Sequence, residues 1–373
     1  MVLESQTTLP TFAGRLGLIQ RVLPSYRAPF FDLLAASSEK NLSVFAGQPQ
    51  PGESIDSAEA LNRAVFSKTR NIHFFSPSSS LYFCFQTGLT AWLDQWNPDA
   101  LIVEANFRYL SSPAGIRWMT QRSRPVIGWG LGAPLDRGPI STFRNRFLSK
   151  FDALIAYSRR GADQYAACGF PADKIFVALN SVAAAPTWPL PVRSIPFSGQ
   201  PVLLFVGRLQ ARKRLPALLE ACAALPAELK PRLVIVGDGP EAESLKSLAR
   251  RLYPAAEFVG ARHGAELTEY FLSADLFVLP GTGGLAVQQA MSYGLPVIVA
   301  EGDGTQDDLV RPANGWQIPR DDQDALKEVL LEALQDVNRL RKMGEESYRI
   351  TLQEINLEQM LKIFIRVLNQ VSR

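Results

Sequence analysis

Short apolar runs alternate with amphipathic stretches along the whole chain. Eight of these runs are continuous and apolar, which is typical of parallel strands that helices cover on both faces. They are residues 16–22, 100–105, 125–130, 153–158, 201–207, 231–237, 275–280 and 295–300. Amphipathic stretches such as 215–225 and 264–274 lie between them. This alternation predicts α/β architecture with doubly wound sheets.

A proline-rich stretch without any period divides the chain near its middle. Residues 183–201 hold five prolines, which favours a linker. The length of 373 residues also favours two domains. After residue 322 the pattern becomes helical, and the strongly amphipathic segment 356–370 needs a surface to cover. The predicted parts are a first domain at 1–182, a linker at 183–200, a second domain at 201–350 and a C-terminal helix at 351–373.

Composition narrows the class of protein only slightly. Hydrophobic residues make up 47% and charged residues 20%, as in ordinary globular proteins. A net charge of +3 does not indicate a nucleic-acid partner. The three cysteines, Cys84, Cys168 and Cys222, are too far apart for a disulfide framework, and a reducing cytoplasm is expected. With only two histidines, His73 and His263, no metal site is expected.

Neither a signal peptide nor a membrane span is expected from the sequence. The N-terminus lacks a basic region followed by an apolar core, so no signal peptide is expected. No apolar run approaches the length of a membrane span. The chain is therefore expected to be soluble, or to lie on a membrane surface.

The first candidate site follows the run at 201–207. Arg208 stands directly after Gly207, where the strand should end, and Lys213 follows before a helix. Ligands of open α/β sheets bind at the carboxyl ends of the strands. A guanidinium and an ammonium at that edge suit a diphosphate, although a solvated basic loop would have the same sequence.

A second turn, at 237–240, follows the run at 231–237. It reads Gly-Asp-Gly-Pro and lacks the third glycine of a dinucleotide fingerprint, which occurs nowhere in the chain. A nicotinamide enzyme is therefore disfavoured. A tight turn in which Asp238 caps its neighbours is the favoured interpretation.

A third candidate is the glycine-rich loop at 281–284, between a predicted strand and a predicted helix. Glycines let the backbone approach a ligand closely, and free N–H groups at a helix start favour a phosphate. Gln289 lies one to two turns into that helix and could face the same ligand, or it could be an ordinary surface residue. Gln288 cannot point the same way.

In combination these motifs resemble glycosyltransferase family 4. GRLQARKRL (207–215), VGDGP (236–240) and GGLAVQQAMSYGLPVIVA (283–300) are similar to its C-terminal domain. IAYSRRGADQYAACGFPADKIFVALNSV (155–182) is similar to the segment that closes its first domain. VLPSYRAPFFDLL (22–34) resembles a subset of its members.

The resemblance implies a GT-B architecture, in which two Rossmann-like domains face each other across a cleft. The N-terminal domain would bind an acceptor, the C-terminal domain would bind a nucleotide-sugar, and the last helix would return to the N-terminal domain. It also implies sugar transfer with retention at the anomeric carbon, without a metal or other cofactor. The expected acceptor is a glycan or a lipid-linked molecule.

Roles for individual residues follow from the motifs and the resemblance together. Arg208 and Lys213 are expected to stabilise the diphosphate leaving group. The expected donor-binding residues are Gly207, Ala261, Arg262, Thr282, Gly283, Gly284, Leu285 and Gln289. The expected acceptor-binding residues are Tyr26, Arg27, Glu104 and Asn106. For Glu104 a structural hydrogen bond at a strand end is the favoured alternative.

The chain departs from the family pattern at several positions. The family has two glutamates eight positions apart, where this chain has Gly281 and Gln289. Leu131 stands where many members have a histidine, and residues 24–27 replace a glycine-rich loop. These departures leave open a relative that binds a nucleotide-sugar or a partner without catalysis. A nucleotide-sugar epimerase is a third alternative, although it would need acids and histidines in its cleft, and this chain has only two histidines.

A basic segment at 137–150 suggests a further partner. Arg137, Arg144, Arg146 and Lys150 are interleaved with phenylalanines, as in a helix that buries its aromatic rings and presents its cations. An ordinary solvated helix is the alternative. The functional interpretation is contact with anionic lipid headgroups at the inner face of the membrane, or with an anionic acceptor.

Overall fold

A computed structural model describes residues 9–372 except 52, 54, 78, 80 and 135–137. The chain divides into two compact units. Unit 1 comprises residues up to 182 together with 357 onward, and unit 2 comprises residues 183–356.

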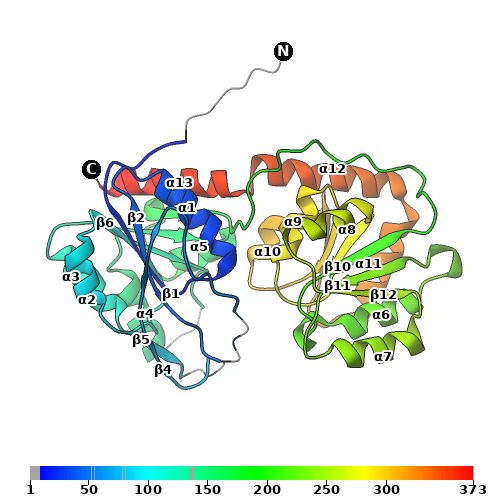
Figure 1. The fold of residues 1–373 in the computed structure, drawn as a ribbon, viewed down its shortest axis with the longest axis horizontal. Coiled ribbons are helices and arrows are strands. Elements are labelled where there is room, and N and C mark those ends of the chain that lie inside the picture. Colours follow the sequence, from blue (N-terminus) through cyan, green and yellow to red (C-terminus); the bar gives the residue numbers. More distant parts are fainter. Residues whose placement is uncertain are drawn as a thin grey trace, which may run out of the picture. The chain divides into compact units, whose positions relative to one another are not determined.

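Unit 1 is built on a seven-stranded parallel sheet with the strand order β3-β2-β1-β6-β7-β8-β9 (Figure 1). The strands are β1 (Leu16–Val22), β2 (Leu42–Gly47), β3 (Val65–Lys68), β6 (Ala100–Glu104), β7 (Val126–Gly130), β8 (Ala153–Ala156) and β9 (Ile175–Val177). A separate antiparallel pair consists of β4 (Asn71–Phe74) and β5 (Phe83–Gln86). The central strands are almost wholly buried because helices cover both faces of the sheet.

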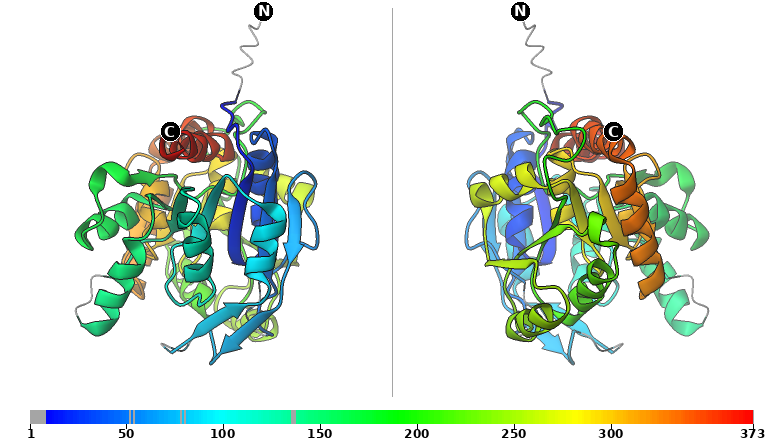
Figure 2. Two further views of the ribbon diagram at one scale, coloured as in Figure 1. Left: turned by 90° about the vertical axis from the view of Figure 1, so that its left-hand side faces the viewer. Right: turned by 90° about the vertical axis from the view of Figure 1, so that its right-hand side faces the viewer.

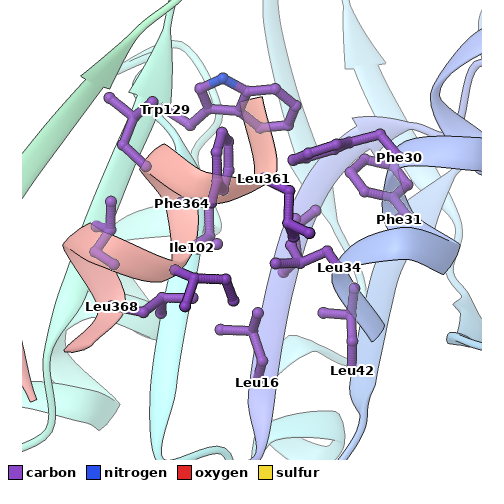
Figure 3. Close-up of a cluster of buried hydrophobic side chains, with 14 of the residues drawn as sticks. Leu16, Phe30, Phe31, Leu34, Leu42, Ile102, Trp129, Leu361, Phe364 and Leu368 are labelled. Carbon is purple, nitrogen blue, oxygen red and sulfur yellow. The ribbon is translucent and has the colours of Figure 1, made fainter. Parts of the chain in front are cut away.

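The helices of unit 1 connect these strands, and one of them comes from the far end of the chain. They are η1 (Ser25–Arg27), α1 (Ala28–Ala36), α2 (Leu89–Trp96), α3 (Ser112–Thr120), α4 (Pro139–Leu148), α5 (Arg159–Ala167), η2 (Ala172–Lys174) and α13 (Leu357–Val371). Helix α13 packs against α1, β8 and β9. Its buried side chains Leu361, Phe364 and Leu368 lie over the sheet (Figure 3). The Phe364 ring contacts Phe30 and Trp129, with centroid distances of 4.9 and 5.1 Å.

Unit 2 contains a six-stranded parallel sheet with the order β12-β11-β10-β13-β14-β15 (Figure 1). The strands are β10 (Val202–Val206), β11 (Arg232–Val236), β12 (Ala256–Gly260), β13 (Leu276–Leu279), β14 (Val297–Ala300) and β15 (Gly315–Ile318). The helices are η3 (Ala211–Lys213), α6 (Leu215–Ala223), η4 (Ala227–Leu229), α7 (Ala242–Leu252), η5 (Gly264–Leu267), α8 (Thr268–Ser273), α9 (Leu285–Ser292), α10 (Thr305–Leu309), α11 (Gln323–Gln335) and α12 (Val337–Gln353).

In both units the first strand lies inside the sheet. The next strands of the chain are added on one side of it and the later strands on the other side. In unit 2 the switch lies between β10 and β13, and in unit 1 it lies between β1 and β6. Ligands of such sheets bind beyond the carboxyl ends of the strands at this switch. Within the described residues, no helix is both long enough and apolar enough to cross a membrane.

Candidate functional site

The turns after β10 and β11 of unit 2 are locked together through their backbones. Leu209 N–H donates to the Asp238 carbonyl at 2.9 Å, and Glu241 N–H donates to the Leu209 carbonyl at 3.2 Å. A Cβ at Gly237 would lie 1.9 Å from the Gly207 carbonyl oxygen, and the turn therefore requires glycine there. The Gly-Asp-Gly motif thus acts structurally, and it holds Arg208 at the carboxyl end of β10 with an exposed side chain.

Lys213 brings the end of β10 to the glycine-rich loop after β13. Its side chain is buried, and its ammonium group donates to the Thr282 carbonyl oxygen at 2.7 Å. The Thr282 N–H in turn donates to the Arg212 carbonyl at 3.0 Å. These two bonds join segments that are about seventy residues apart in the sequence. The sequence analysis expected both segments at one ligand site, and the structure places them in contact.

The loop approaches Lys213 so closely that two of its positions admit no side chain. A Cβ at Gly281 would lie 2.1 Å from the Arg212 carbonyl oxygen, and one at Gly283 would lie 2.5 Å from the Lys213 ammonium nitrogen. Gly283 also has a φ of 104°, which disfavours other residues. The tight packing of this loop on η3 therefore requires a residue without a side chain at position 281.

Burial sets the electrostatic character of Lys213. It lowers the pKa of the ammonium group to about 8, with a further contribution from the charge of Arg212. The group donates to a carbonyl oxygen, which carries only a partial negative charge. A bound phosphate would supply the full counter-charge that the group lacks.

The first turn of α9 adds backbone donors and side chains of different character. Gly284 caps this helix, and Leu285 is exposed. Gln289 is half-buried one turn further on, whereas Gln288 is buried and donates to the Ile355 carbonyl at 2.7 Å. Of the two glutamines, Gln288 therefore serves the fold, and Gln289 keeps the access that a ligand contact needs.

Ala261 and Arg262 follow the end of β12, beside the turn at 237. The Gly237 N–H donates to the Gly260 carbonyl at 2.9 Å, which places this strand end next to the turn. Ala261 is exposed, and Arg262 is half-buried with its guanidinium donating to the Ala261 carbonyl. A depression of about 400 Å³ in unit 2 includes Arg262 but not Lys213.

Sequence reasoning missed Gln306 as a neighbour of the glycine-rich loop. This side chain is buried, and its amide nitrogen lies 3.5 Å from where a Cβ of Gly284 would be. It belongs to helix α10, which follows β14. The signal available in the sequence was a polar residue that closely follows two glycines, Gly302 and Gly304. Within the described part of the chain, no three His, Cys, Asp or Glu side chains cluster as metal ligands would.

The corresponding edge of unit 1 is built around Arg27. This side chain is only 3% exposed, and its guanidinium lies over the rings of Tyr26, Trp129 and Tyr157, 4.9 to 5.3 Å from their centroids. One terminal nitrogen donates to the Asn180 side-chain oxygen. Sequence analysis singled out Tyr26 and Arg27 but not the other three residues, which lie at the ends of different strands.

Glu104 and Asn106 both have local structural partners. The Arg21 backbone N–H donates to the Glu104 carboxylate at 2.5 Å, and this is the strand-end hydrogen bond that the sequence favoured. Burial raises the pKa of the Glu104 carboxyl, against the opposing effects of that hydrogen bond and of the charges of Arg21 and Arg27. The Asn106 side-chain oxygen accepts from the Arg108 N–H at 3.1 Å.

The basic helix differs from the expected arrangement. In α4, Phe143 is 61% exposed, whereas Arg144 is buried and donates to the Cys168 sulfur at 3.8 Å. The reason is the helical period: position 144 shares one face with Phe147 and Leu148, and that face packs on the core. The expectation of buried aromatic rings and exposed cations was therefore wrong for positions 143 and 144. Arg137 lies outside the described residues.

Two family models together match nearly all of residues 41–350. One, described as Glycosyltransferase Family 4, matches residues 41–185, and the other, described as Glycosyl transferases group 1, matches residues 191–350. The chain belongs to glycosyltransferase family 4. The resemblance identified in the sequence is thereby confirmed.

Curated relatives of this family 4 chain match over shorter stretches. GDP-mannose-dependent alpha-mannosyltransferase of Mycobacterium tuberculosis (strain CDC 1551 / Oshkosh) is 40% identical over 124 residues, which are 32% of this chain and 31% of that protein. Sulfoquinovosyl transferase SQD2 of Arabidopsis thaliana is 36% identical over 119 residues, which are 31% of this chain and 22% of that protein. The matches span less than a third of the length of either relative.

Solved structures match the whole fold. Anabaena Alr3699/HepE in complex with UDP has a TM-score of 0.69 and 16% identity, with 95% of this chain and 99% of that chain covered. A similarity at this level of identity shows the fold alone. The GT-B architecture predicted for this family 4 member is confirmed.

Proposed function

We propose that the protein is a retaining glycosyltransferase that moves a sugar from a nucleotide-sugar to a glycan or lipid-linked acceptor. The observation that carries this proposal is the contact between the Lys213 ammonium group and the Thr282–Gly283 loop. In this contact a buried cation packs against the glycine-rich loop that follows β13, and this supports a diphosphate-binding role for the two segments. Family membership and the names of the relatives, which use GDP-mannose or transfer sulfoquinovose, support the same class of reaction.

The proposed mechanism relies on stabilisation of the leaving group. When the bond between the anomeric carbon and the diphosphate breaks, negative charge develops on the diphosphate oxygens. Arg208, Lys213 and the amides of Gly283 and Gly284 would stabilise that charge, because preorganised donors in a dry site lower the barrier most. Gln289 would hydrogen-bond the ribose, and the backbone of residues 261–262 would contact the base. Tyr26 and Asn106 of unit 1 would contact the acceptor, and the buried Arg27 would hold the Tyr26 ring in place rather than touch the acceptor itself.

The test begins with identification of the donor. A thermal-shift screen across nucleoside diphosphates and their sugars should identify a ligand, since one at 100 times its Kd stabilises a protein by about 2.7 kcal/mol. With that donor, Arg208→Ala should reduce turnover by about 10²–10³-fold, by analogy with the loss of one preorganised donor. Near-normal turnover of this variant would contradict the assignment.

A binding relative without catalysis is the second candidate, and Gly281 favours it. The packing of this position on the Arg212 carbonyl excludes the acidic side chain that the resemblance to the family implies there. Such a protein would show the thermal shift with a nucleotide-sugar and no release of nucleoside diphosphate with any acceptor. Release of nucleoside diphosphate that Arg208→Ala abolishes would exclude it.

A contact with an anionic surface through the described part of the basic segment, 138–150, is also proposed. Arg146 on α4 and Lys150 in the turn that follows this helix are exposed. Each cation near an anionic lipid surface contributes about 1 kcal/mol. Reversal of these two charges should weaken sedimentation with anionic vesicles at low salt, and unchanged sedimentation would contradict the proposal.

A further inference from the structure

The antiparallel pair β4–β5 forms a small sheet apart from the main sheet of unit 1 (Figure 2). It exposes apolar side chains. Ile72 and Phe85 are direct cross-strand partners and are 38% and 40% exposed. Phe74, two residues after Ile72 and therefore on the same face, is 44% exposed. This face is thus apolar and open to solvent.

The opposite face of the pair turns toward the rest of unit 1 and carries the polar contacts. The His73 ring nitrogen lies 2.9 Å from the Tyr82 hydroxyl, and Cys84 is fully buried. The guanidinium of Arg21 lies 5.9 Å from the centroid of the Tyr82 ring. A hairpin on the surface of a globular protein normally buries its apolar face and exposes its polar one. Here the inner face is buried with Tyr82 and Cys84, but the outer face carries large apolar side chains as well, which indicates that the outer face has a partner.

The apolar surface continues from β5 into a neighbouring loop and α4. Cys84 N–H donates to the Arg108 carbonyl at 3.0 Å, so the loop at 105–111 lies alongside β5. Phe107 of that loop contacts Phe143 of α4 at a centroid distance of 6.0 Å. Ile140 and Phe143 are 62% and 61% exposed. Single exposed apolar residues are common, but linked groups of them mark interaction sites.

The charges of the same segments have one sign. Residues 65–88 contain Lys68 and Arg70 but no Asp or Glu. The loop at 105–111 and the segment 138–151 also lack acids. Lys68 and Arg70 are exposed. A second copy of this surface would bring cations against cations, whereas anionic headgroups would complement them.

We propose that this surface, formed by the outer face of β4–β5, the loop at 105–111 and the exposed side of α4, lies on an anionic lipid bilayer. Aromatic and aliphatic side chains would enter the headgroup region, where amphipathic rings are favoured, and the flanking cations would contact the headgroups. The proposal extends the contact suggested for α4 by adding the apolar component that retains a protein on a membrane. It does not depend on sugar transfer.

Sedimentation with vesicles of phosphatidylcholine alone, or with added phosphatidylglycerol, tests the proposal on the full chain. The triple variant Ile72→Thr/Phe74→Thr/Phe85→Thr keeps residues suited to strands and removes the apolar face. It should bind the anionic vesicles at least about tenfold more weakly than the natural protein. The matched control Val192→Thr/Leu252→Thr/Leu272→Thr removes three exposed apolar side chains of unit 2, and should bind normally.

A second variant tests the charges without touching the apolar face. Lys68→Gln/Arg70→Gln should weaken binding to the anionic vesicles by about fivefold for each lost cation. This substitution also keeps the proposal falsifiable if the triple variant fails to fold. Binding by the natural protein should fall at high salt because screening shortens the reach of the cations.

Three results would overturn the proposal. The first is that the natural protein sediments with neither kind of vesicle. The second is that the hairpin triple variant and the unit 2 control lose equal amounts of vesicle binding. The third is that light scattering shows a dimer for the natural protein and a monomer for the hairpin triple variant. The last result would identify a second copy of the chain as the occupant. The nucleotide-induced thermal shift should persist in all variants, and so failure of lipid binding is distinguishable from failure of the proposed function.

Discussion

The carboxyl edges of the two parallel sheets are built in different ways. In unit 2 the edge consists of glycine-rich turns in which backbone packs on backbone, and a Cβ at Gly281 or Gly237 would overlap a carbonyl oxygen. In unit 1 the edge consists of large side chains, with the buried Arg27 guanidinium surrounded by the rings of Trp129 and Tyr157. Two parallel sheets of the same kind therefore have carboxyl edges of different construction: backbone forms the edge in unit 2, and side chains form it in unit 1.

The difference corresponds to the ligands proposed for each edge. A diphosphate is common to all nucleotide-sugars, and backbone N–H groups with fixed cations recognise it irrespective of the sugar. Acceptors differ between members of a family, and side chains are the part of a protein that varies most readily at constant fold. Substitutions at the two edges should therefore differ in their effects on stability and on nucleotide affinity.

The largest effect is expected at the main-chain edge. Gly281→Ala should lower the free energy of unfolding by about 3 kcal/mol, because the added methyl group would lie 2.1 Å from the Arg212 carbonyl oxygen and the loop would have to move. Gly284→Ala is the matched control, since its nearest neighbour would be at an ordinary 3.5 Å. Chemical unfolding of both variants measures the difference, and equal stability would show that the loop is not tightly packed.

A smaller loss of stability is expected at the side-chain edge. Arg27→Gln removes a buried cation from the rings of Trp129 and Tyr157 and should cost about 2 kcal/mol of unfolding free energy. Nucleotide affinity should stay unchanged, because its proposed site lies in unit 2. Thermal unfolding with and without the nucleotide identified in the screen measures both quantities. A loss of nucleotide affinity would mean that the two edges do not act separately.

The pH dependence of nucleotide binding sharpens the role of Lys213. Its pKa of about 8 leaves it charged at neutral pH, and a bound diphosphate would favour the charged form further. The Kd should therefore rise as the pH increases above about 8, by about tenfold per pH unit while the bound form stays protonated. Isothermal titration across this range measures the effect. Lys213→Arg keeps its charge and should remove this rise, whereas a flat profile in the natural protein would contradict the assignment.

The smallest effect is expected at Gln289. This side chain is half-buried on α9, and an amide can make the hydrogen bonds to a ribose that the family glutamate makes. Gln289→Glu should leave nucleotide affinity equal or slightly higher, as measured by titration. Gln288→Glu is the control, because its amide donates to the Ile355 carbonyl, which a carboxylate cannot do. A large loss of nucleotide affinity in Gln289→Glu would show that position 289, like position 288, does not tolerate a carboxylate.

The pattern of apolar runs was sufficient to predict the central strands. All eight predicted runs form strands of the two parallel sheets. Strands β2 and β15 were not singled out. The apolar run of β2 is interrupted by Ser43, although the strand is fully buried, and β15 is a four-residue strand at the edge of its sheet with a mixed burial pattern. The period of α4 was visible as well, but which of its faces packs on the core depends on neighbours that the sequence does not specify.

The sequence by itself determined the α/β class, the family and the residues of the glycine-rich loop, because buried parallel strands and phosphate-binding turns have local patterns. Only the tertiary structure decided that Lys213 contacts the carbonyl of Thr282, that Arg27 is enclosed by aromatic rings, and that the outer face of β4–β5 is apolar. Each of these features depends on residues far apart in the chain or on which side of an element is covered. Burial depends on the packing of the whole unit. A local sequence pattern shows which residues share a face, but it does not show which face is covered.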